Sequence, residues 1–224
     1  MKRHAWRIEA REYARHEARR GRRFAFTRLT PARTALVVLD MVPFFVADNP
    51  YCHGIVPVIG RLAETLRTAG GTVAWVLPAA GERTPVTDEF FGPEVAERYR
   101  TCGGTGPLAE RLWPDFTVQQ GDLLVEKSAA SAFFPGRCDL PRLLAEREID
   151  TVLITGTVTN VCCESSARDA STLGFRVILV ADANAARRDR DHNATLHTIY
   201  RSFGDVRPAA DVLALIGQYG YGGS

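Results

Sequence analysis

Three residues whose side chains can do chemistry together each follow a short apolar run in the sequence: Asp40, Lys127 and Cys162. Cys162 falls in the first turn of a predicted helix, near unpaired backbone N–H groups and the positive end of the helix dipole. We therefore predict a thiol pKa below its reference of ~8.5. A carboxylate beside such a thiol can accept its proton, and a lysine can orient the carboxylate and favour the thiolate. These residue types together predict nucleophilic attack on an acyl carbon.

The elements that must position these residues alternate along the chain. We expect strands at 34–39, 72–77, 122–126, 151–155, 176–180 and near Val206, and helices at 2–23, 55–70, 140–147, from about 159 to Gly174, 191–202 and 208–216. This alternation predicts an α/β protein with a three-layer αβα, Rossmann-like fold and a mostly parallel central sheet. Ligands bind outside the carboxyl ends of the strands in such sheets, so Asp40, Lys127 and the loop before Cys162 should converge there.

The loop and helix that carry Cys162 have further expected roles. Thr159 or Asn160 can cap the helix, and the turn from Gly156 to Thr159 with the Cys162 N–H can supply donors for an oxyanion. Cysteine is also a common packing residue, and that role fits Cys163, which turns by about 100° around the helix towards the sheet. For Cys162 we favour catalysis, because two charged residues are expected to converge on it.

The composition is that of an ordinary globular protein. The 224 residues are 46% hydrophobic and 24% charged, with a net charge of +2 that implies no special partner. We divide the chain into an arginine-rich helical extension (1–30), a catalytic domain (31–217) and a tail (218–224), with a long irregular connection at 78–106 that covers the site.

No apolar run approaches the ~20 residues that span a bilayer, and the charged start resembles no signal peptide, so we expect a cytoplasmic protein without membrane contact. The five cysteines are an odd number without a CxxC pair, which favours reduced thiols over disulfides or a zinc site.

The arginine-rich extension admits two interpretations. Arginine runs can bind nucleic acid. However, glutamates are interleaved at spacings that allow pairing with arginines three or four residues away, and apolar anchors are present: Glu9, Glu12, Glu17, Trp6, Ile8 and Tyr13. We favour a helix lying across its own domain or a neighbouring subunit, and expect no nucleic-acid partner.

Three motifs in order carry a resemblance to a known family: VVLDM, EKSAASAFF and GTVTNVCCESSARDA. Over about 34–216 the chain resembles the cysteine hydrolases of the isochorismatase-like superfamily. This group includes nicotinamidase, N-carbamoylsarcosine amidase, streptothricin hydrolase and the ureidoacrylate and biuret amidohydrolases. The resemblance implies a catalytic triad of Asp40, Lys127 and Cys162, a non-proline cis peptide before Val158, and an oxyanion hole formed by the N–H groups of Val158 and Cys162. It also implies a homo-oligomer, either a dimer or a tetramer.

The chain departs from the family pattern after Asp40. Many members read Asp-x-Gln-Asn-Asp-Phe there, whereas this chain keeps only the aspartate and the final Phe45. The nicotinamidase metal site needs an Asp-x-His cluster, and Asp48 and His53 are too sparse to match it. We therefore predict no metal and no cofactor. For His53, His192 and His197 we expect surface or capping roles.

The sequence thus predicts a cysteine-dependent amidohydrolase. It would cleave a C–N bond of a small amide, carbamoyl, ureide or lactam substrate through a covalent thioester on Cys162, with Phe45, Trp75 and Phe133 as candidate pocket walls. Two alternatives stay open. One is an isochorismatase-type vinyl ether hydrolase led by Asp40, against which Cys162 argues; the other is a non-enzymatic binding or assembly protein on this fold.

Overall fold

The structure, a computed structural model, describes residues 1–82 and 84–220, except the side chains of residues 219 and 220. Its strands are β1 (Thr34–Leu39), β2 (Thr72–Pro78), β3 (Leu123–Lys127), β4 (Thr151–Thr157), β5 (Arg176–Ala185) and β6 (Asp205–Arg207). Its α-helices are α1 (Ala10–Arg20), α2 (Pro43–Val46), α3 (Pro50–Thr68), α4 (Pro85–Phe91), α5 (Pro93–Arg100), α6 (Leu140–Glu146), α7 (Glu164–Thr172), α8 (Asp189–Ser202) and α9 (Ala209–Gly220). Short 3-10 turns η1 (Pro31–Arg33) and η2 (Leu108–Arg111) and a π-helical turn η3 (Thr159–Cys163) complete the described elements.

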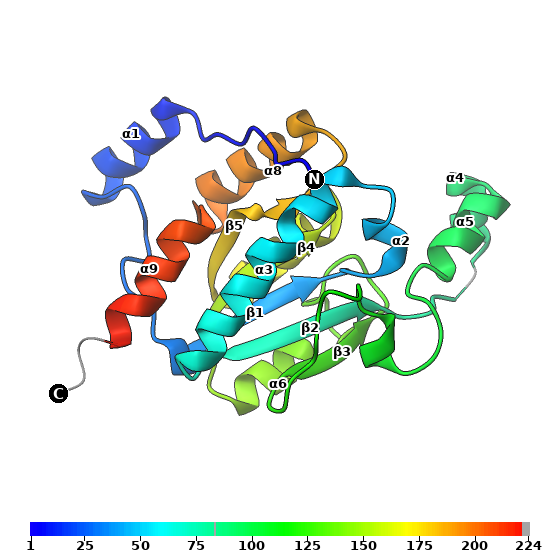
Figure 1. Ribbon diagram of the computed structural model, residues 1–224. Helices are drawn as coiled ribbons and strands as arrows, with labels where there is room; N and C mark the ends of the chain where they lie inside the picture. Colours follow the sequence, from blue (N-terminus) through cyan, green and yellow to red (C-terminus); the bar gives the residue numbers. More distant parts are fainter. Residues whose placement is uncertain (83, 221–224) are drawn as a thin grey trace.

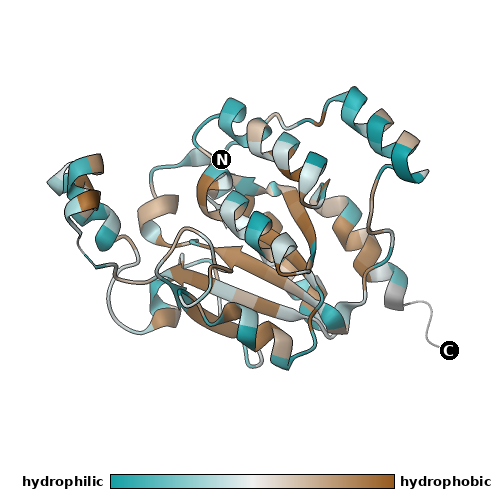
Figure 2. Ribbon diagram, turned by 180° about the vertical axis from the view of Figure 1, so that it is seen from behind, coloured by the Kyte–Doolittle hydropathy of each residue, from teal (hydrophilic) through white to brown (hydrophobic). Residues whose placement is uncertain are grey.

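The six strands form one parallel sheet in the order β3-β2-β1-β4-β5-β6. The central strands β1 and β4 are buried throughout because helices cover both faces. Along β1, Leu36 and Val38 pack with α3 and α9, whereas Ala35, Val37 and Leu39 pack with α6, α7 and α8. Figure 1 shows α3 and α9 on one side of the strands, and Figure 2 shows the apolar character of the sheet. The predicted three-layer αβα fold is confirmed.

The strand order fixes where a site can form. The chain runs outward from β1 to β3, then returns to β4 beside β1 and continues to the other edge. At such a switch point the loops after the two central strands diverge and leave a crevice at their carboxyl ends. Gly156 near the end of β4 has φ +112°, and a Cβ there would lie 2.2 Å from the Leu39 carbonyl oxygen. This glycine therefore allows β1 and β4 to approach closely at the crevice.

Several predicted boundaries are wrong. The predicted helix at 2–23 is reduced to α1, because residues 2–9 form an extended segment, here called the N-terminal arm. The connection at 78–106 is not irregular throughout: it contains α4 and α5, which stand apart from the sheet in Figure 1. The predicted tail begins inside α9, and residues 221–224 lie outside the described residues.

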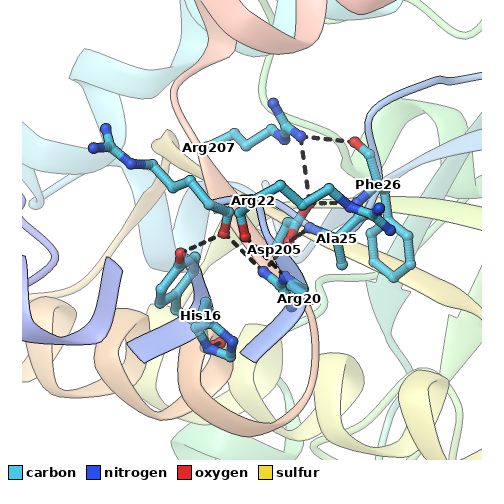
Figure 3. A network of polar contacts seen from close by, with 9 residues as sticks. His16, Arg20, Arg22, Ala25, Phe26, Asp205 and Arg207 are labelled. Atoms are coloured by element: carbon cyan, nitrogen blue, oxygen red, sulfur yellow. Dashed lines mark hydrogen bonds and ion pairs between the residues drawn. The ribbon is translucent and has the colours of Figure 1, made fainter. Parts of the chain in front are cut away.

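The N-terminal extension packs on its own chain through a buried carboxylate (Figure 3). Asp205 on β6 is 1% exposed and accepts hydrogen bonds from the backbone N–H groups of Ala25 (2.8 Å) and Phe26 (2.9 Å). It also pairs with Arg207 at 3.4 Å and Arg20 at 3.7 Å. A buried charge is tolerated only with such partners. The extension therefore packs on its own domain, which is one of the two positions expected for it, and packing on a neighbouring subunit stays a prediction.

We predict that Asp205→Ala lowers the free energy of unfolding by about 3 kcal/mol or more, because it leaves two backbone donors and a buried arginine without their acceptor. Urea unfolding followed by circular dichroism measures the loss. Glu146→Ala is the matched control, since it breaks the exposed pair with Arg142 and should cost less than about 1 kcal/mol. Equal losses in the two variants would contradict the anchoring role of Asp205.

Candidate active site

Asp40 lies immediately after β1, at the carboxyl end of the sheet. Its φ of +54° is in the left-handed region, which aspartate tolerates better than most residues. The conformation is held by a hydrogen bond from the Asp40 N–H to the Val76 carbonyl (2.9 Å) and one from the Val42 N–H to the Asp40 carbonyl (2.8 Å). The side chain is only 1% exposed, so the chain turns sharply to keep a carboxylate inside the crevice.

Lys127 is the last residue of β3, and its side chain reaches across the end of β2. The residue is 4% exposed. Its Nζ lies 3.0 Å from Asp40 Oδ2 and donates hydrogen bonds to the Ala129 carbonyl (3.1 Å) and to Cys162 Sγ (3.5 Å). The ammonium group therefore touches both the carboxylate and the thiol.

Cys162 is on η3, the π-helical turn between β4 and α7, and it is 8% exposed. The peptide bond between Thr157 and Val158 is cis, as the family resemblance implies. The Val158 carbonyl accepts hydrogen bonds from the N–H groups of Val161 (3.0 Å) and Cys163 (3.3 Å), which closes the turn. Cys163 is fully buried in the core, as predicted.

The predicted helix cap is wrong. Val158 occupies the N-cap position of η3, without a side-chain capping bond. The Thr159 hydroxyl is turned inward instead and shares a 2.9 Å hydrogen bond with His192 Nδ1. The expected surface or capping role of His192 is therefore also wrong, since this ring has no solvent exposure. His53, by contrast, donates to the Ala47 carbonyl (3.1 Å) near the start of α3, and His197 is partly exposed on α8.

The electrostatics of the site differ from the sequence-based expectation. Burial, followed by the charge of Asp40, raises the pKa of the Cys162 thiol to about 12, although Lys127 opposes the rise. Burial likewise raises the pKa of Asp40, again opposed by Lys127. The predicted low thiol pKa is thus wrong, because desolvation and the carboxylate outweigh the position at the start of a helical turn. The thiol is therefore held in its neutral form, with Lys127 Nζ 3.0 Å from the carboxyl group of Asp40.

The predicted pocket walls are placed differently. Trp75 is in the core, and its indole N–H donates to Asp122 (2.8 Å), which precedes β3 at the opposite end of the sheet. Phe133 is fully buried, with its ring 5.5 Å from that of Phe175, which precedes β5 at the same far end. The prediction that Trp75 and Phe133 line the pocket is therefore wrong, because both side chains point towards the amino ends of the strands. Phe45 is half-buried and packs against Phe44, so its role as a wall stays a prediction.

A cavity of about 300 Å³ lies between the segment after Asp40 and the loop after α5. It is lined by Pro43, Phe44, Thr101, Cys102, Gly103, Gly104, Thr105, Glu110 and Arg111. Burial raises the pKa of Cys102 to about 11, and the same cavity is lined by Pro43 and Phe44, which follow Asp40 closely in the chain. The sequence analysis missed these residues, since only the contact between two distant loops makes them a pocket.

Arg111 holds the loop that forms one side of this cavity. Its guanidinium donates to the carbonyls of Gly103 (2.6 Å) and Pro78 (2.6 Å) and to the Glu126 carboxylate (2.8 Å). These bonds tie the loop to the ends of β2 and β3, and β3 also carries Lys127. The cavity wall is thus fixed relative to Lys127.

Within residues 1–82 and 84–220 no three His, Cys, Asp or Glu side chains are grouped so that they could hold a metal ion. Asp48 and His53 belong to no such group. In the same described part of the chain, every helix is too short or too polar to cross a membrane.

With the sheet order and the three converging side chains established, comparison with known proteins is informative. Residues 34–211 match the model of the isochorismatase domain. Maleamate amidohydrolase from Pseudomonas putida is 37% identical over 200 residues, covering 86% of this chain and 89% of that protein. Ureidoacrylate amidohydrolase from Agrobacterium fabrum is 27% identical over 215 residues, covering 85% and 92%. The crystal structure of a cysteine hydrolase from Pseudomonas syringae pv. phaseolicola superposes with a TM-score of 0.75 at 27% identity, covering 87% of this chain and 97% of that one.

The protein is thus a hydrolase with a three-layer αβα fold and a candidate site at a topological switch point. More specifically, the chain belongs to the isochorismatase family, whose domain model spans most of its length.

We predict that Asp40→Asn makes Cys162 more reactive towards iodoacetamide near neutral pH. The substitution removes the charge that raises the thiol pKa but leaves Lys127, which lowers it. Each unit by which the pKa falls should speed alkylation about tenfold, because only the thiolate reacts. Mass spectrometry of the Cys162 peptide measures the rate against pH, and thermal melting checks the fold.

Lys127→Met is the opposite matched variant, because it removes the charge that favours the thiolate. Its alkylation profile should move to higher pH, whereas that of Asp40→Asn moves to lower pH. Alkylation of Asp40→Asn that is unchanged or slower than in the wild type would contradict this electrostatic assignment.

Proposed function

We propose that the protein is a cysteine-dependent amidohydrolase that cleaves a C–N bond of a small amide, carbamoyl, ureide or lactam substrate. One observation carries the proposal: a single buried ammonium group, Lys127 Nζ, lies 3.0 Å from Asp40 Oδ2 and 3.5 Å from Cys162 Sγ. This arrangement puts a nucleophile, a proton acceptor and a fixed positive charge at the carboxyl ends of three strands. The proposed reaction uses no metal or cofactor.

In the first half of the reaction, Cys162 Sγ forms a bond to the substrate carbonyl carbon while its proton passes to Asp40. The carbonyl π electrons move to the oxygen, and we assign the backbone N–H groups of Val158 and Cys162 as its donors. The tetrahedral adduct then collapses. The C–N bond breaks with its electron pair on nitrogen, and Asp40 returns the proton to the departing ammonia or amine, leaving a thioester.

In the second half, Asp40 removes a proton from water as the water oxygen attacks the thioester carbon. The C–S bond breaks, the sulfur recovers a proton, and a carboxylic or carbamic acid leaves. A raised pKa suits Asp40 for this work, because a carboxyl group that binds a proton more tightly is a better base towards a thiol and water. Lys127 keeps the carboxylate ionised between the steps.

The family relatives support an amide substrate. Two similar proteins are a maleamate amidohydrolase and a ureidoacrylate amidohydrolase, and both names describe C–N hydrolysis. The cavity beside the triad, at about 300 Å³, is at the small end of ligand pockets. Phe44 and, by extension, Phe45 give it an apolar side that suits a substrate with a planar or apolar body.

We further propose a homo-oligomeric protein, a dimer or tetramer, that acts in the cytoplasm and binds no nucleic acid. Large apolar side chains are exposed on the projecting helices α4 and α5 and support association: Val86, Phe90, Phe91, Val95 and Tyr99. The pairing of Glu9 and Glu17 with neighbouring arginines supports a structural role for the arginine-rich extension.

The test is ammonia release from a panel of small amides, ureides and lactams. We predict that the wild type releases ammonia from at least one of them and that Cys162→Ala loses at least ~10³-fold in kcat on that substrate. Asp40→Asn should lose activity comparably, because the thiol proton then has no acceptor. Cys138→Ala is the matched control, since it removes a partly buried thiol that is not among the residues lining the cavity and leaves the triad intact.

Two results would overturn the proposal. Activity that survives Cys162→Ala but not Asp40→Asn would select an Asp40-led reaction of the isochorismatase type. Absence of turnover on every substrate, together with retention on an anionic resin that is lost when residues 1–23 are deleted, would select a binding protein.

A further inference from the structure

We propose that His4, on the N-terminal arm, is a positioning residue for the turn that carries Cys162. The arm, residues 2–9, lies outside the matched domain of residues 34–211, so the family model assigns it nothing. A chain of buried contacts nevertheless runs from His4 through His192 and Thr159 into that turn. The inference rests on the proposed function, in which Cys162 is the nucleophile.

The His4 ring is fixed on every side. Its side chain is 2% exposed and is stacked between Tyr51 (centroids 4.0 Å apart, planes at 5°) and His192 (4.2 Å, 10°). The Ala186 backbone N–H donates to Nε2 at 3.0 Å, so the proton of the neutral ring is on Nδ1, which donates to Asp189 Oδ1 at 2.6 Å. That bond also lowers the pKa of Asp189. Stacking and two hydrogen bonds therefore set both the position and the tautomer of His4.

His192 connects the fixed ring of His4 to the turn that carries Cys162. One face of its buried ring lies against His4, and its Nδ1 shares a 2.9 Å hydrogen bond with the Thr159 hydroxyl. Thr159 is the first residue of η3, one residue beyond the cis peptide bond between Thr157 and Val158 and three positions before Cys162. A shift of the His192 ring would move the Thr159 side chain and with it the N–H groups assigned to the oxyanion.

The sequence of α3 is adapted to the arm. The Lys2 N–H donates to the Pro50 carbonyl at 2.8 Å, and a Cβ on Gly54 would lie 1.8 Å from the Lys2 carbonyl oxygen. Glycine is unfavourable in a helix interior, and the close approach of the arm explains why position 54 is nevertheless a glycine. On the other side, Asn193 of α8 accepts from the Arg7 N–H (2.8 Å) and donates to the Ala5 carbonyl (3.1 Å). The arm is thus seated between α3 and α8, and α8 packs against the turn.

The experiment compares His4→Phe and Thr159→Val with the double variant. Phenylalanine keeps the ring stack but removes both hydrogen bonds of His4, and valine keeps the shape of threonine but removes its hydroxyl. We expect each single variant to lower kcat about tenfold with KM nearly unchanged, because misplacement of reacting groups slows chemistry more than binding. The double variant should lose little more than either single one, since both act through the same contact chain.

Alkylation of Cys162 by iodoacetamide at fixed pH is the second readout and needs no substrate. The alkylation rate should differ from that of the wild type in His4→Phe and Thr159→Val. It should equal the wild-type rate in His197→Ala, which removes a histidine from α8, the helix that also carries His192. Failure to find any substrate would count against the proposed function, whereas the alkylation rates would still decide the role of His4. If His4→Phe does not fold, Asp189→Ala replaces it, because this variant removes the carboxylate that accepts the hydrogen bond from His4 Nδ1.

The proposal is overturned if the variants lower the melting temperature while kcat and the alkylation rate stay at wild-type values. It is equally overturned if the effects of His4→Phe and Thr159→Val on kcat multiply in the double variant, because the two residues would then act independently.

Discussion

The buried ion pair between Lys127 and Asp40 is the interaction on which the rest of the site depends. Both residues are almost fully removed from water, at 4% and 1% exposure, so each charge is tolerable only because the other is present. Their strands, β3 and β1, are separated by β2, and the long side chain of Lys127 at the end of β3 reaches across it. The sheet order and the left-handed turn at Asp40 bring the two side chains together.

The pair also determines where the proton is held. Burial and the charge of Asp40 favour the neutral thiol, and in the proposed reaction Asp40, which lies beside Lys127, accepts the thiol proton when substrate binds. In that proposal the site differs from thiols that rest as thiolates, because the thiol loses its proton only when the site is occupied. A neutral thiol is less exposed to adventitious oxidation and alkylation. The same carboxylate then has the proton that the leaving nitrogen requires.

The sequence was sufficient for the fold and for the three side chains at its centre. Strands rich in β-branched residues alternate with helices, and such a pattern permits few arrangements, so convergence of Asp40, Lys127 and Cys162 followed from strand ends alone. Features that depend on long-range contacts were not predictable. The inward hydroxyl of Thr159 bonds to His192, and one face of the His192 ring is covered by His4 of the N-terminal arm, about 190 residues away in sequence. Trp75 and Phe133 were misplaced because residue type does not reveal towards which end of the sheet a side chain points.

The most direct test of the account is to follow Cys162 itself during a single turnover. Enzyme in excess over a hydrolysed amide is quenched with acid at successive times, and the Cys162 peptide is analysed by mass spectrometry. The account predicts a peptide that carries the acyl mass of the substrate, which appears with ammonia release and decays as the acid product forms. Product formation through the whole time course with Cys162 unmodified at every point would contradict it.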